Sequence, residues 1–284
     1  MPEGDTLFRV AYQIRKQICG KRIEAARGRP ELKRAGELAG HCLEKAEARG
    51  KHLLLDFDNQ LSVHSHLGMT GSWHIYPRGE RWRKPAHRAA LALRFATHDL
   101  VCFSPKLIEL DTRSRIHRNP MLTSLGPDLL AEDFDEAEAM RRLRRHNDLA
   151  IGEALMAQQL VAGIGNVYKS EILFMNRIDP FKPVASLDDD SLKQCLRSAR
   201  RYLQRNLEGL RRKFRGTTHG ERLWTYRRKD MPCLECGTPI RMRRQGETAR
   251  STYYCPKCQG VDKERQGVDK ERPGVDEEHR GVEK

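Results

Sequence analysis

The chain has 284 residues and a formal net charge of +14, and 38% of its residues are hydrophobic. This length suits two domains of ordinary size, and no apolar run approaches the roughly 18 residues that span a bilayer. The first residues are acidic and lack an apolar stretch, which excludes a signal peptide. We therefore expect a soluble cytoplasmic protein without a membrane partner. The basic excess favours a polyanionic partner such as nucleic acid.

Basic residues gather in three clusters, which sharpen that expectation. The clusters lie at residues 141–145, 211–213 and 227–229. A few of their side chains stand between apolar positions of predicted helices, so we expect a basic face on a folded domain rather than a charged tail.

The first half of the chain predicts one helix followed by short strands. Residues 3–19 carry apolar side chains at helical spacing. From about residue 20 to residue 115, strand-like runs alternate with turn residues. The clearest runs are 52–58, 61–67 and 89–95. This pattern is typical of a β-sandwich or β-barrel, which we place at residues 2–118.

The second half predicts a linker and then helices. Residues 117–130 contain Asn-Pro and Gly-Pro-Asp, which are typical of a linker. Apolar spacing predicts helices near residues 133–146, 149–160, 165–176 and 188–208. We place a helical domain at residues 128–222 and a separate small unit at residues 223–259.

The end of the chain is a seven-residue repeat. The unit Gln-Gly-Val-Asp-Lys-Glu-Arg at residues 259–265 is followed by three similar units. Each unit has one apolar residue and one glycine, so a coiled coil would have no seam to bury. Residues 260–284 are therefore expected to form a disordered, charge-balanced tail.

Four cysteines near residue 245 have the spacing of a metal site. Cys233 and Cys236 form one Cys-x-x-Cys pair, and Cys255 and Cys258 form another, 18 residues further on. This spacing predicts one structural Zn²⁺ held by all four thiolates, which would close the coordination sphere. The alternatives are two disulfides or four unrelated thiols, which an intracellular setting disfavours.

A glycine-rich turn joins two of the predicted helices. It reads Gly163-Ile-Gly165-Asn166, and the second helix should begin at Gly165 or Asn166. Such a turn presents backbone N–H groups and a helix N-terminus to an anion, commonly a phosphate. The same pattern fits a tight helix–helix turn in which asparagine is a cap.

The chain begins with Met1, Pro2 and Glu3. Removal of Met1 would leave a secondary amine at Pro2, which can attack a sugar C1′ and form an iminium. Glu3 would then be the nearest carboxylate for acid–base chemistry. Proline is common at this position for other reasons, so the pattern acquires meaning only from its context.

The context for Pro2 and Glu3 comes from six motifs that follow one another along the chain. They are Met-Pro-Glu-Gly-Asp-Thr at the start, Arg-Gly-Lys-His at 49–52, His-Leu-Gly-Met at 66–69, Leu-Gly-Pro-Asp at 125–128, the glycine-rich turn, and the four cysteines. Together they resemble the family of formamidopyrimidine-DNA glycosylase and endonuclease VIII, over residues 2–259. The resemblance implies an α+β multidomain fold. Its parts would be an N-terminal β-sandwich with an N-terminal helix, a helical helix–two-turns–helix domain, and a C-terminal zinc β-hairpin.

The resemblance also implies a bifunctional DNA glycosylase and AP lyase of base excision repair, acting on double-stranded damaged DNA by β,δ-elimination. Pro2 matches the nucleophile, and Glu3 matches the glutamate that assists sugar ring opening. Lys51 matches a lysine that contacts phosphate and donates a proton. Asn166 matches an asparagine that binds phosphate beside the lesion, and Arg250 matches the zinc-hairpin arginine that grips phosphates around the damaged nucleotide.

Two motifs point to different branches of this family. The purine-directed branch has an Asp-Pro-Arg-Arg-Phe-Gly-like loop that fills the space left by the flipped base. This chain has Ser-Pro-Lys-Leu-Ile-Glu at 104–109 instead, which is similar to endonuclease VIII. Met69, in His-Leu-Gly-Met, matches the wedge methionine of the purine branch, although a core position is the alternative. We expect oxidised pyrimidines as substrates and a closest similarity to endonuclease VIII.

His64 and His66 share one face of a predicted strand. The sequence places no acidic or thiol residue beside them, so we interpret both as structural residues rather than metal ligands.

Three other functions fit part of the sequence. They are an oxidised-purine glycosylase of the same family, a non-catalytic zinc-hairpin DNA-binding protein, and a zinc-ribbon RNA-binding protein. A pure binding protein has no need of Pro2, Glu3 and Lys51 together, and the RNA-binding alternative leaves the N-terminal half unexplained. We expect a monomer, associated with the nucleoid if its source is bacterial.

Overall fold

The computed structural model describes residues 2–209, 211–216 and 220–261. In these segments, every helix is too short or too polar to cross a membrane. The tail predicted at residues 260–284 lies outside the described residues from residue 262 onward.

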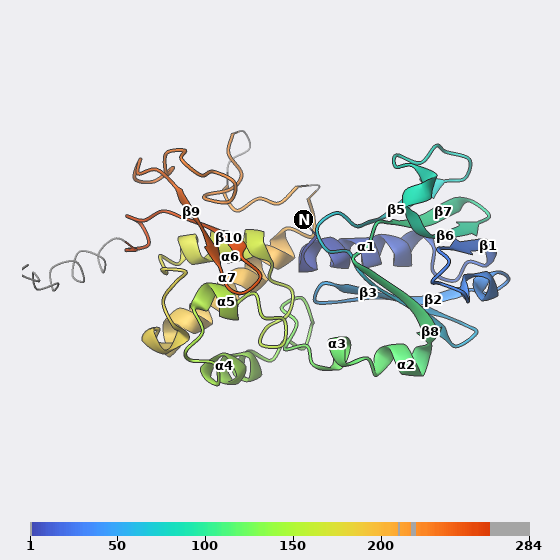
Figure 1. The fold of residues 1–284 in the computed structure, drawn as a ribbon, viewed down its shortest axis with the longest axis horizontal. Coiled ribbons are helices and arrows are strands. Elements are labelled where there is room, and N and C mark those ends of the chain that lie inside the picture. The colour runs from blue at the N-terminus through green and yellow to red at the C-terminus, as the bar shows by residue number, and fades with distance from the viewer. Residues whose placement is uncertain (1, 210, 217–219, 262–284) are drawn as a thin grey trace, which may run out of the picture.

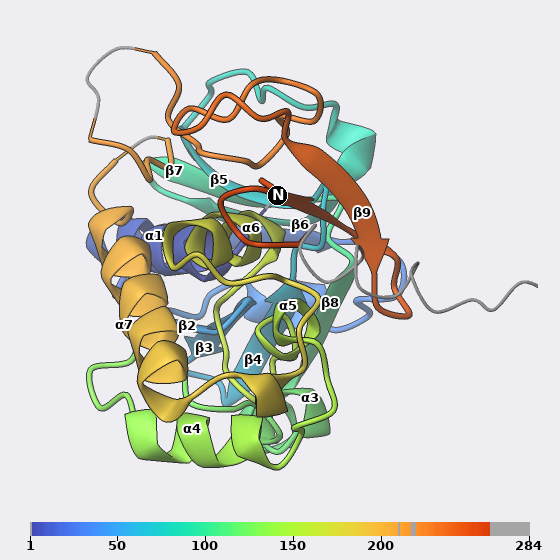
Figure 2. The same ribbon diagram turned by 90° about the vertical axis from the view of Figure 1, so that its left-hand side faces the viewer.

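The N-terminal part is a sandwich of two four-stranded antiparallel sheets, as the sequence predicts. One sheet has the order β1-β6-β7-β5, and the other has the order β2-β3-β4-β8. The strands are β1 (Ile23–Gly28), β2 (Leu43–Arg49), β3 (His52–Phe57), β4 (Leu61–His66), β5 (Ser72–Pro77), β6 (Ala89–Phe95), β7 (His98–Phe103) and β8 (Leu107–Thr112). Helix α1 (Gly4–Gln17) lies at the level between the two sheets (Figures 1 and 2).

Apolar periodicity explains how the sandwich packs. Leu7, Ala11 and Ile14 of α1 lie on one helix face and are fully buried in a core shared with both sheets. All six residues of β3 are buried, so the polar side chains of His52 and Asp56 need partners inside the protein.

Short helices connect the sandwich to a helical domain. They are α2 (Arg113–His117) and α3 (Pro120–Thr123), followed by α4 (Glu136–Arg144), α5 (Ile151–Ala154), α6 (Asn166–Met175) and α7 (Asp189–Arg205). Three single 3₁₀ turns are η1 (Ala35–Leu38), η2 (Ala86–Arg88) and η3 (Val184–Ser186). The helix predicted at 149–160 is wrong in its second half. There the Gln158 side chain bonds to the backbone of Met156, Gly163 and Ile164, which holds a turn instead of a helix.

The C-terminal unit is a β-hairpin docked on the helical domain. Its strands are β9 (Arg241–Gln245) and β10 (Arg250–Tyr254), and Arg250 pairs with Gln245 across them. The Gln245 side chain donates to the Pro180 carbonyl at 2.8 Å, and the Gln259 side chain donates to the Ile178 carbonyl at 2.7 Å. These buried hydrogen bonds fix the hairpin on the domain.

Four arginines of the three basic clusters are bonded within the fold, whereas others, such as Arg145 and Arg211, are exposed. Arg142, Arg144 and Arg228 donate to backbone carbonyl oxygens. Arg212 forms an ion pair with Asp5. A guanidinium has five N–H donors and can join several segments at once, so these arginines connect parts of the fold.

Figure 1 shows the sandwich and the helical domain side by side, with the N-terminus between them. In both views the hairpin β9–β10 and the β5–β6 connection lie on the side of the molecule that also carries the N-terminus (Figures 1 and 2). Helix α4 lies on the opposite side.

Candidate active site

The N-terminus of the chain is anchored by Glu3 at the start of α6. The Glu3 side chain is fully buried and accepts hydrogen bonds from the backbone N–H groups of Gly165, Val167 and Tyr168, at 3.1, 2.9 and 3.3 Å. The glycine-rich turn therefore does bind an anion, but the anion is the protein's own carboxylate. These three N–H groups are therefore not available to a phosphate.

The glycines of the turn allow this close approach. A Cβ on Gly165 would lie 2.3 Å from the Glu3 Cδ, so no other residue fits there without displacing Glu3. The Gly4 N–H donates to the Gly163 carbonyl at 3.0 Å. Pro2, half-buried, is thus fixed by the two residues that follow it.

A second anchor holds the N-terminal helix. The buried Asp5 carboxylate accepts two hydrogen bonds from Arg212, at 2.6 and 2.7 Å, and Arg212 also donates to the Thr6 hydroxyl. The sequence shows Gly-Asp-Thr as a motif without a role. Asp5 and Thr6 receive an arginine from the segment after α7, so only the tertiary structure reveals the role of the motif.

Lys51 stands in the turn between β2 and β3, which is docked on the helical domain. The Gly50 N–H donates to the Asp128 carboxylate at 2.6 Å, and the same side chain accepts from the Leu130 N–H at 3.0 Å. The Leu-Gly-Pro-Asp motif is therefore the clamp that places Lys51 beside the N-terminus.

Two lysines at the site share a low-polarity environment. Burial lowers the pKa of Lys51 to about 8, against an opposing effect of the nearby Glu3 charge and with a further decrease from Arg250 and Arg212. Burial likewise lowers the pKa of Lys169 to about 7. Lys51 is half-buried, whereas Lys169 is 1% exposed. Lys51 is therefore the lysine that a substrate can contact.

The hairpin brings Arg250 over the site. Arg250 is half-buried at the start of β10, and its Nη1 lies 4.0 Å from the Met69 Sδ. Asn166, at the start of α6, is only 3% exposed and donates to the Ser251 carbonyl at 2.6 Å and to the Ser251 hydroxyl at 3.2 Å. The structure therefore brings Arg250, Asn166 and Lys51 to the same side of the helical domain as the N-terminus.

Lys169 is a residue that sequence reasoning missed. Its Nζ donates to the Thr252 hydroxyl at 2.7 Å, which links α6 to β10 beside the Asn166 contact. A lysine three residues after a helix start is ordinary in a sequence, so no local signal identifies it.

The four cysteines form a compact cluster. All four Sγ atoms lie within 4.8 Å of one another. The pairs Cys233–Cys258 and Cys236–Cys255 are separated by 3.8 and 3.5 Å, too far for disulfides. A tetrahedron with Zn–S bonds of about 2.3 Å has an S–S edge of about 3.8 Å. The cluster therefore fits a tetrahedral zinc site.

Two short turns of the sandwich lie close together near Arg250. Met69 is 69% exposed, which excludes the core position considered for it. The β7–β8 connection contains only Ser104, Pro105 and Lys106. A Cβ on Gly68 would lie 2.8 Å from the Lys106 Cβ, so the two turns are in contact.

His64 has an acidic partner, contrary to the expectation from the sequence. Glu109, on the neighbouring strand β8, accepts from His64 Nδ1 at 3.1 Å, and His64 Nε2 accepts in turn from His52 Nδ1 at 2.8 Å. Burial lowers the pKa of His52 to about 3 and that of His66 to about 4, so both are neutral near pH 7. Strand pairing brings Glu109 opposite His64 from 45 residues away, which local sequence does not show.

Known proteins with the same architecture match nearly the whole chain. The family model of the formamidopyrimidine-DNA glycosylase N-terminal domain matches residues 1–113, and that of the formamidopyrimidine-DNA glycosylase H2TH domain matches residues 125–215. The chain is 38% identical over 264 residues to probable endonuclease 8 2 of Streptomyces coelicolor, covering 91% of this chain and 94% of that protein. It is 35% identical over 260 residues to a DNA-(apurinic or apyrimidinic site) lyase of Mycolicibacterium smegmatis, covering 91% and 99%.

A solved structure of Lactococcus lactis Fpg, in complex with DNA containing N7-benzyl-Fapy-dG, has a TM-score of 0.77 and 26% identity. The match covers 91% of this chain and 99% of that chain. This chain therefore belongs to the formamidopyrimidine-DNA glycosylase and endonuclease 8 family of DNA-repair glycosylases and lyases. The family and the fold class expected from the order of the motifs are confirmed.

Proposed function

We propose that this protein is a bifunctional DNA glycosylase and AP lyase of base excision repair that uses Pro2 as its nucleophile. The observation that carries the proposal is the anchoring of Glu3 at the start of α6. This anchoring holds the amino terminus close to the charged side chains of Lys51 and Arg250. Positively charged side chains in this position can bind the phosphates of a DNA backbone.

The reaction follows from the chemistry of this amine. The damaged nucleotide is flipped out of the duplex, because the sugar C1′ of a stacked nucleotide cannot be reached. The Pro2 nitrogen attacks C1′, the base leaves, and the sugar ring opens to an iminium. The iminium acidifies the C2′ proton, so one elimination expels the 3′ phosphate and a second expels the 5′ phosphate. Glu3 and Lys51 are the groups we assign to these proton transfers.

We assign Lys51, Asn166 and Arg250 to the phosphates around the damaged nucleotide. Asn166 already donates one N–H to the Ser251 carbonyl. It also donates to the Ser251 hydroxyl at 3.2 Å, so a phosphate oxygen would have to replace that hydroxyl as the acceptor. Asn166 and the hairpin would thus bind the backbone as one unit.

Cys233, Cys236, Cys255 and Cys258 would hold one structural Zn²⁺. When bound, the metal supplies a cross-link that folds the hairpin, and it leaves no coordination site open for a substrate. The hairpin itself carries Arg250 to the site.

The expected partner is double-stranded damaged DNA, bound by a single protein chain. The damaged DNA in the L. lactis Fpg complex supports the partner, and the presence of all proposed site residues in one chain supports a monomer. A cytoplasmic protein, associated with the nucleoid in a bacterium, fits such a substrate.

We further propose that oxidised pyrimidines are preferred over 8-oxoguanine. The β7–β8 turn has three residues and offers neither an arginine nor an aromatic ring to read the orphaned base. Lys106 lacks the planar fork of arginine, so its readout of the opposite base should be loose. Met69 remains as an exposed apolar side chain that can fill the space left by the flipped base.

Single-turnover cleavage of a lesion panel tests this preference. Thymine glycol, hydroxylated cytosine and hydantoins should be released faster than 8-oxoguanine paired with cytosine, all in one duplex context. Faster release of 8-oxoguanine than of every oxidised pyrimidine would place the chain in the purine branch. Release of no base, with intact DNA binding, would favour a non-catalytic binding protein.

The low pKa of Lys51 predicts a pH dependence. A proton donor must be protonated, and Lys51 loses its proton as the pH rises through about 8. The single-turnover rate should therefore fall above pH 8, and Lys51→Arg, which stays charged, should lack this descending limb. Lys169→Met is a control variant, because it removes any contribution of Lys169, whose pKa is about 7, to the pH dependence of the rate. An unchanged limb in Lys51→Arg would remove Lys51 from the role of proton donor.

A further inference from the structure

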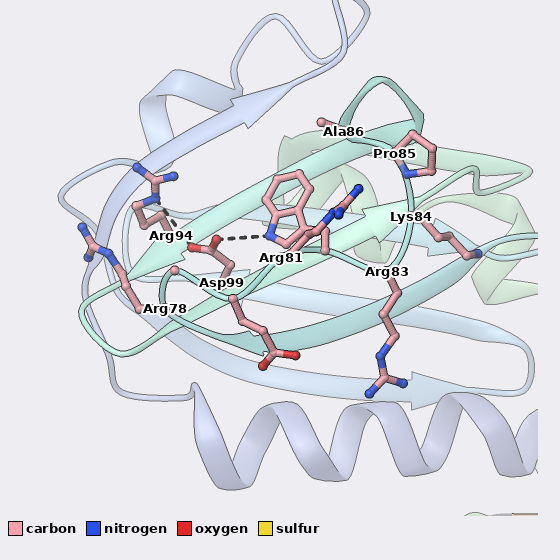
Figure 3. A pocket seen from close by; sticks show the side chains of 11 residues that line it. Arg78, Arg81, Arg83, Lys84, Pro85, Ala86, Arg94 and Asp99 are labelled. Carbon is pink, nitrogen blue, oxygen red and sulfur yellow. Dashed lines mark hydrogen bonds and ion pairs between the residues drawn. The ribbon is translucent and has the colours of Figure 1, made fainter.

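Residues 78–88, called the basic loop below, join β5 to β6 and have no role in the site described above. The loop contains five arginine or lysine residues and one glutamate. It borders a hollow of about 970 Å³, shown in Figure 3. The cations that line the hollow are Arg78, Arg81, Arg83, Lys84 and Arg94.

The basic loop is held in one shape by its tryptophan. The Trp82 indole N–H donates to the Asp99 carboxylate at 3.2 Å, and the ring packs edge-on against Phe103, with centroids 5.8 Å apart. The Arg83 N–H donates to the Tyr76 hydroxyl at 3.3 Å. A loop anchored in this way presents its charged side chains with little loss of conformational entropy on binding.

Two of the arginines that line the hollow are exposed without a counter-ion among the residues that the structure describes. Arg78 forms an ion pair with Glu24, and Arg94 forms one with Asp99. Arg81 and Arg83 are exposed and form no ion pair with any residue that the structure describes. Arg81 and Arg83 are therefore free to bind an anion, as are some exposed arginines of the basic clusters such as Arg145 and Arg211.

The basic loop lies against both turns that flank the site. The Lys84 Nζ donates to the Ser72 hydroxyl at 2.7 Å and to the Thr70 carbonyl at 3.4 Å, directly after Met69. The Ser104 N–H, in the β7–β8 turn, donates to the Arg88 carbonyl at 3.1 Å. The loop also lies on the same side of the molecule as the zinc hairpin (Figures 1 and 2).

We propose that the basic loop is a second DNA-binding element, in which Arg81 and Arg83 bind the phosphate backbone of the duplex that flanks the lesion. This inference rests on the proposed function, because it assumes that the bound DNA passes over Met69 and Arg250. Duplex DNA is stiff over tens of base pairs, so its flank continues past these turns instead of folding away. Free arginines beside that path supply contacts that need no particular base sequence.

Duplexes with a tetrahydrofuran abasic-site analogue test the proposal. Affinity would be measured over a range of salt concentrations for three duplexes: one with long flanks on both sides, one shortened on the 5′ side, and one shortened on the 3′ side. The test variant is Arg81→Gln/Arg83→Gln. The matched control is Arg141→Gln/Arg145→Gln, which removes the same charge from α4 and its C-terminal cap on the opposite side of the molecule.

The test variant should bind the long duplex about 10-fold more weakly, and the slope of log K against log salt should fall by about 2, since each phosphate contact contributes roughly 0.9. Shortening one flank should weaken the wild-type protein and leave the test variant nearly unchanged. Both substituted side chains are exposed, so the melting temperature should not move. The single-turnover rate at saturating protein should also stay constant.

Equal affinity and salt slope in the test variant and the α4 control would overturn the proposal. The proposal would also be overturned if the test variant lost the same affinity for all three duplexes, because such a loss would reflect the lower net charge of the protein and not contacts with a flank. If the wild-type protein bound none of the duplexes, the proposed function itself would fail. If it bound them and the loop variant bound equally well, only the role of the basic loop would fail.

Discussion

Replacing Pro2 with glycine should lower the single-turnover rate of strand cleavage at an abasic site by about 100-fold, less than the roughly 10⁶-fold loss that follows outright removal of a nucleophile. A secondary amine forms an iminium that cannot lose an N–H proton and stays cationic. A primary amine forms a Schiff base that can deprotonate to a neutral imine, which acidifies the C2′ proton less. Glycine keeps an amine, so some residual activity is expected.

The loss should be chemical rather than structural. The bonds from Glu3 to α6 and from Gly4 to Gly163 do not involve the proline ring, so Pro2→Gly should keep its melting temperature and its affinity for an abasic-site analogue. Strand cleavage at the wild-type rate by this variant would show that another group is the nucleophile.

Removing zinc should abolish specific DNA binding while most of the protein stays folded. The hairpin packs against α6 through a small core of Phe174, Cys233, Ile240 and Cys255, and two of these four residues are proposed zinc ligands. Structural zinc contributes on the order of 10 kcal/mol to such units, and apolar packing of this size cannot replace it. A chelator or Cys255→Ser should therefore release Arg250 from the site. The cores of the sandwich and the helical domain are separate and should survive.

Two variants separate metal loss from loss of the arginine. Arg250→Ala should retain zinc and its fold but lose about 10-fold to 100-fold in single-turnover rate, the size expected for one charge-assisted hydrogen bond. Cys42→Ser, a cysteine outside the cluster, should behave as wild type. Full activity in a zinc-free preparation would contradict the structural role of the metal.

Much of the fold is predictable because its signals are local. Alternating strands, helical spacing and the Cys-x-x-Cys pairs each arise within a few residues, and they lead to the sandwich, the helical domain and the hairpin. The helix at 149–160 fails because Gln158 holds the chain in a turn with its side chain, a preference that apolar spacing does not reveal.

The parts of the site that escape prediction depend on contacts between distant segments. The sequence indicates a chemical role for Glu3 from its position beside Pro2, but it does not show that the partners of Glu3 are backbone N–H groups more than 160 residues away. Glu171 is similar: its buried carboxylate accepts from the N–H groups of Trp224, Thr225 and Tyr226, which positions the segment leading to the hairpin. Main-chain donors leave no residue type to recognise in a sequence.

The free charges of the basic loop illustrate the same limit. A sequence gives the number of arginines but not which of them are paired, so Arg212 and Arg81 look alike until their neighbours are known. Arg212 is bonded to Asp5 inside the protein, whereas Arg81 is exposed. Contiguous clusters are therefore a poor guide to a binding surface in a chain rich in arginine.

Mass spectrometry of the borohydride-trapped complex tests the central claim most directly. The wild-type protein would be incubated with abasic-site DNA and borohydride, which reduces the iminium to a stable bond, and the cross-linked peptide would then be sequenced. We predict a single link at the nitrogen of Pro2 in a chain that has lost Met1. A link at Lys51 or Lys169, or the absence of any link while the DNA is still cleaved, would contradict the assignment of Pro2 as the nucleophile.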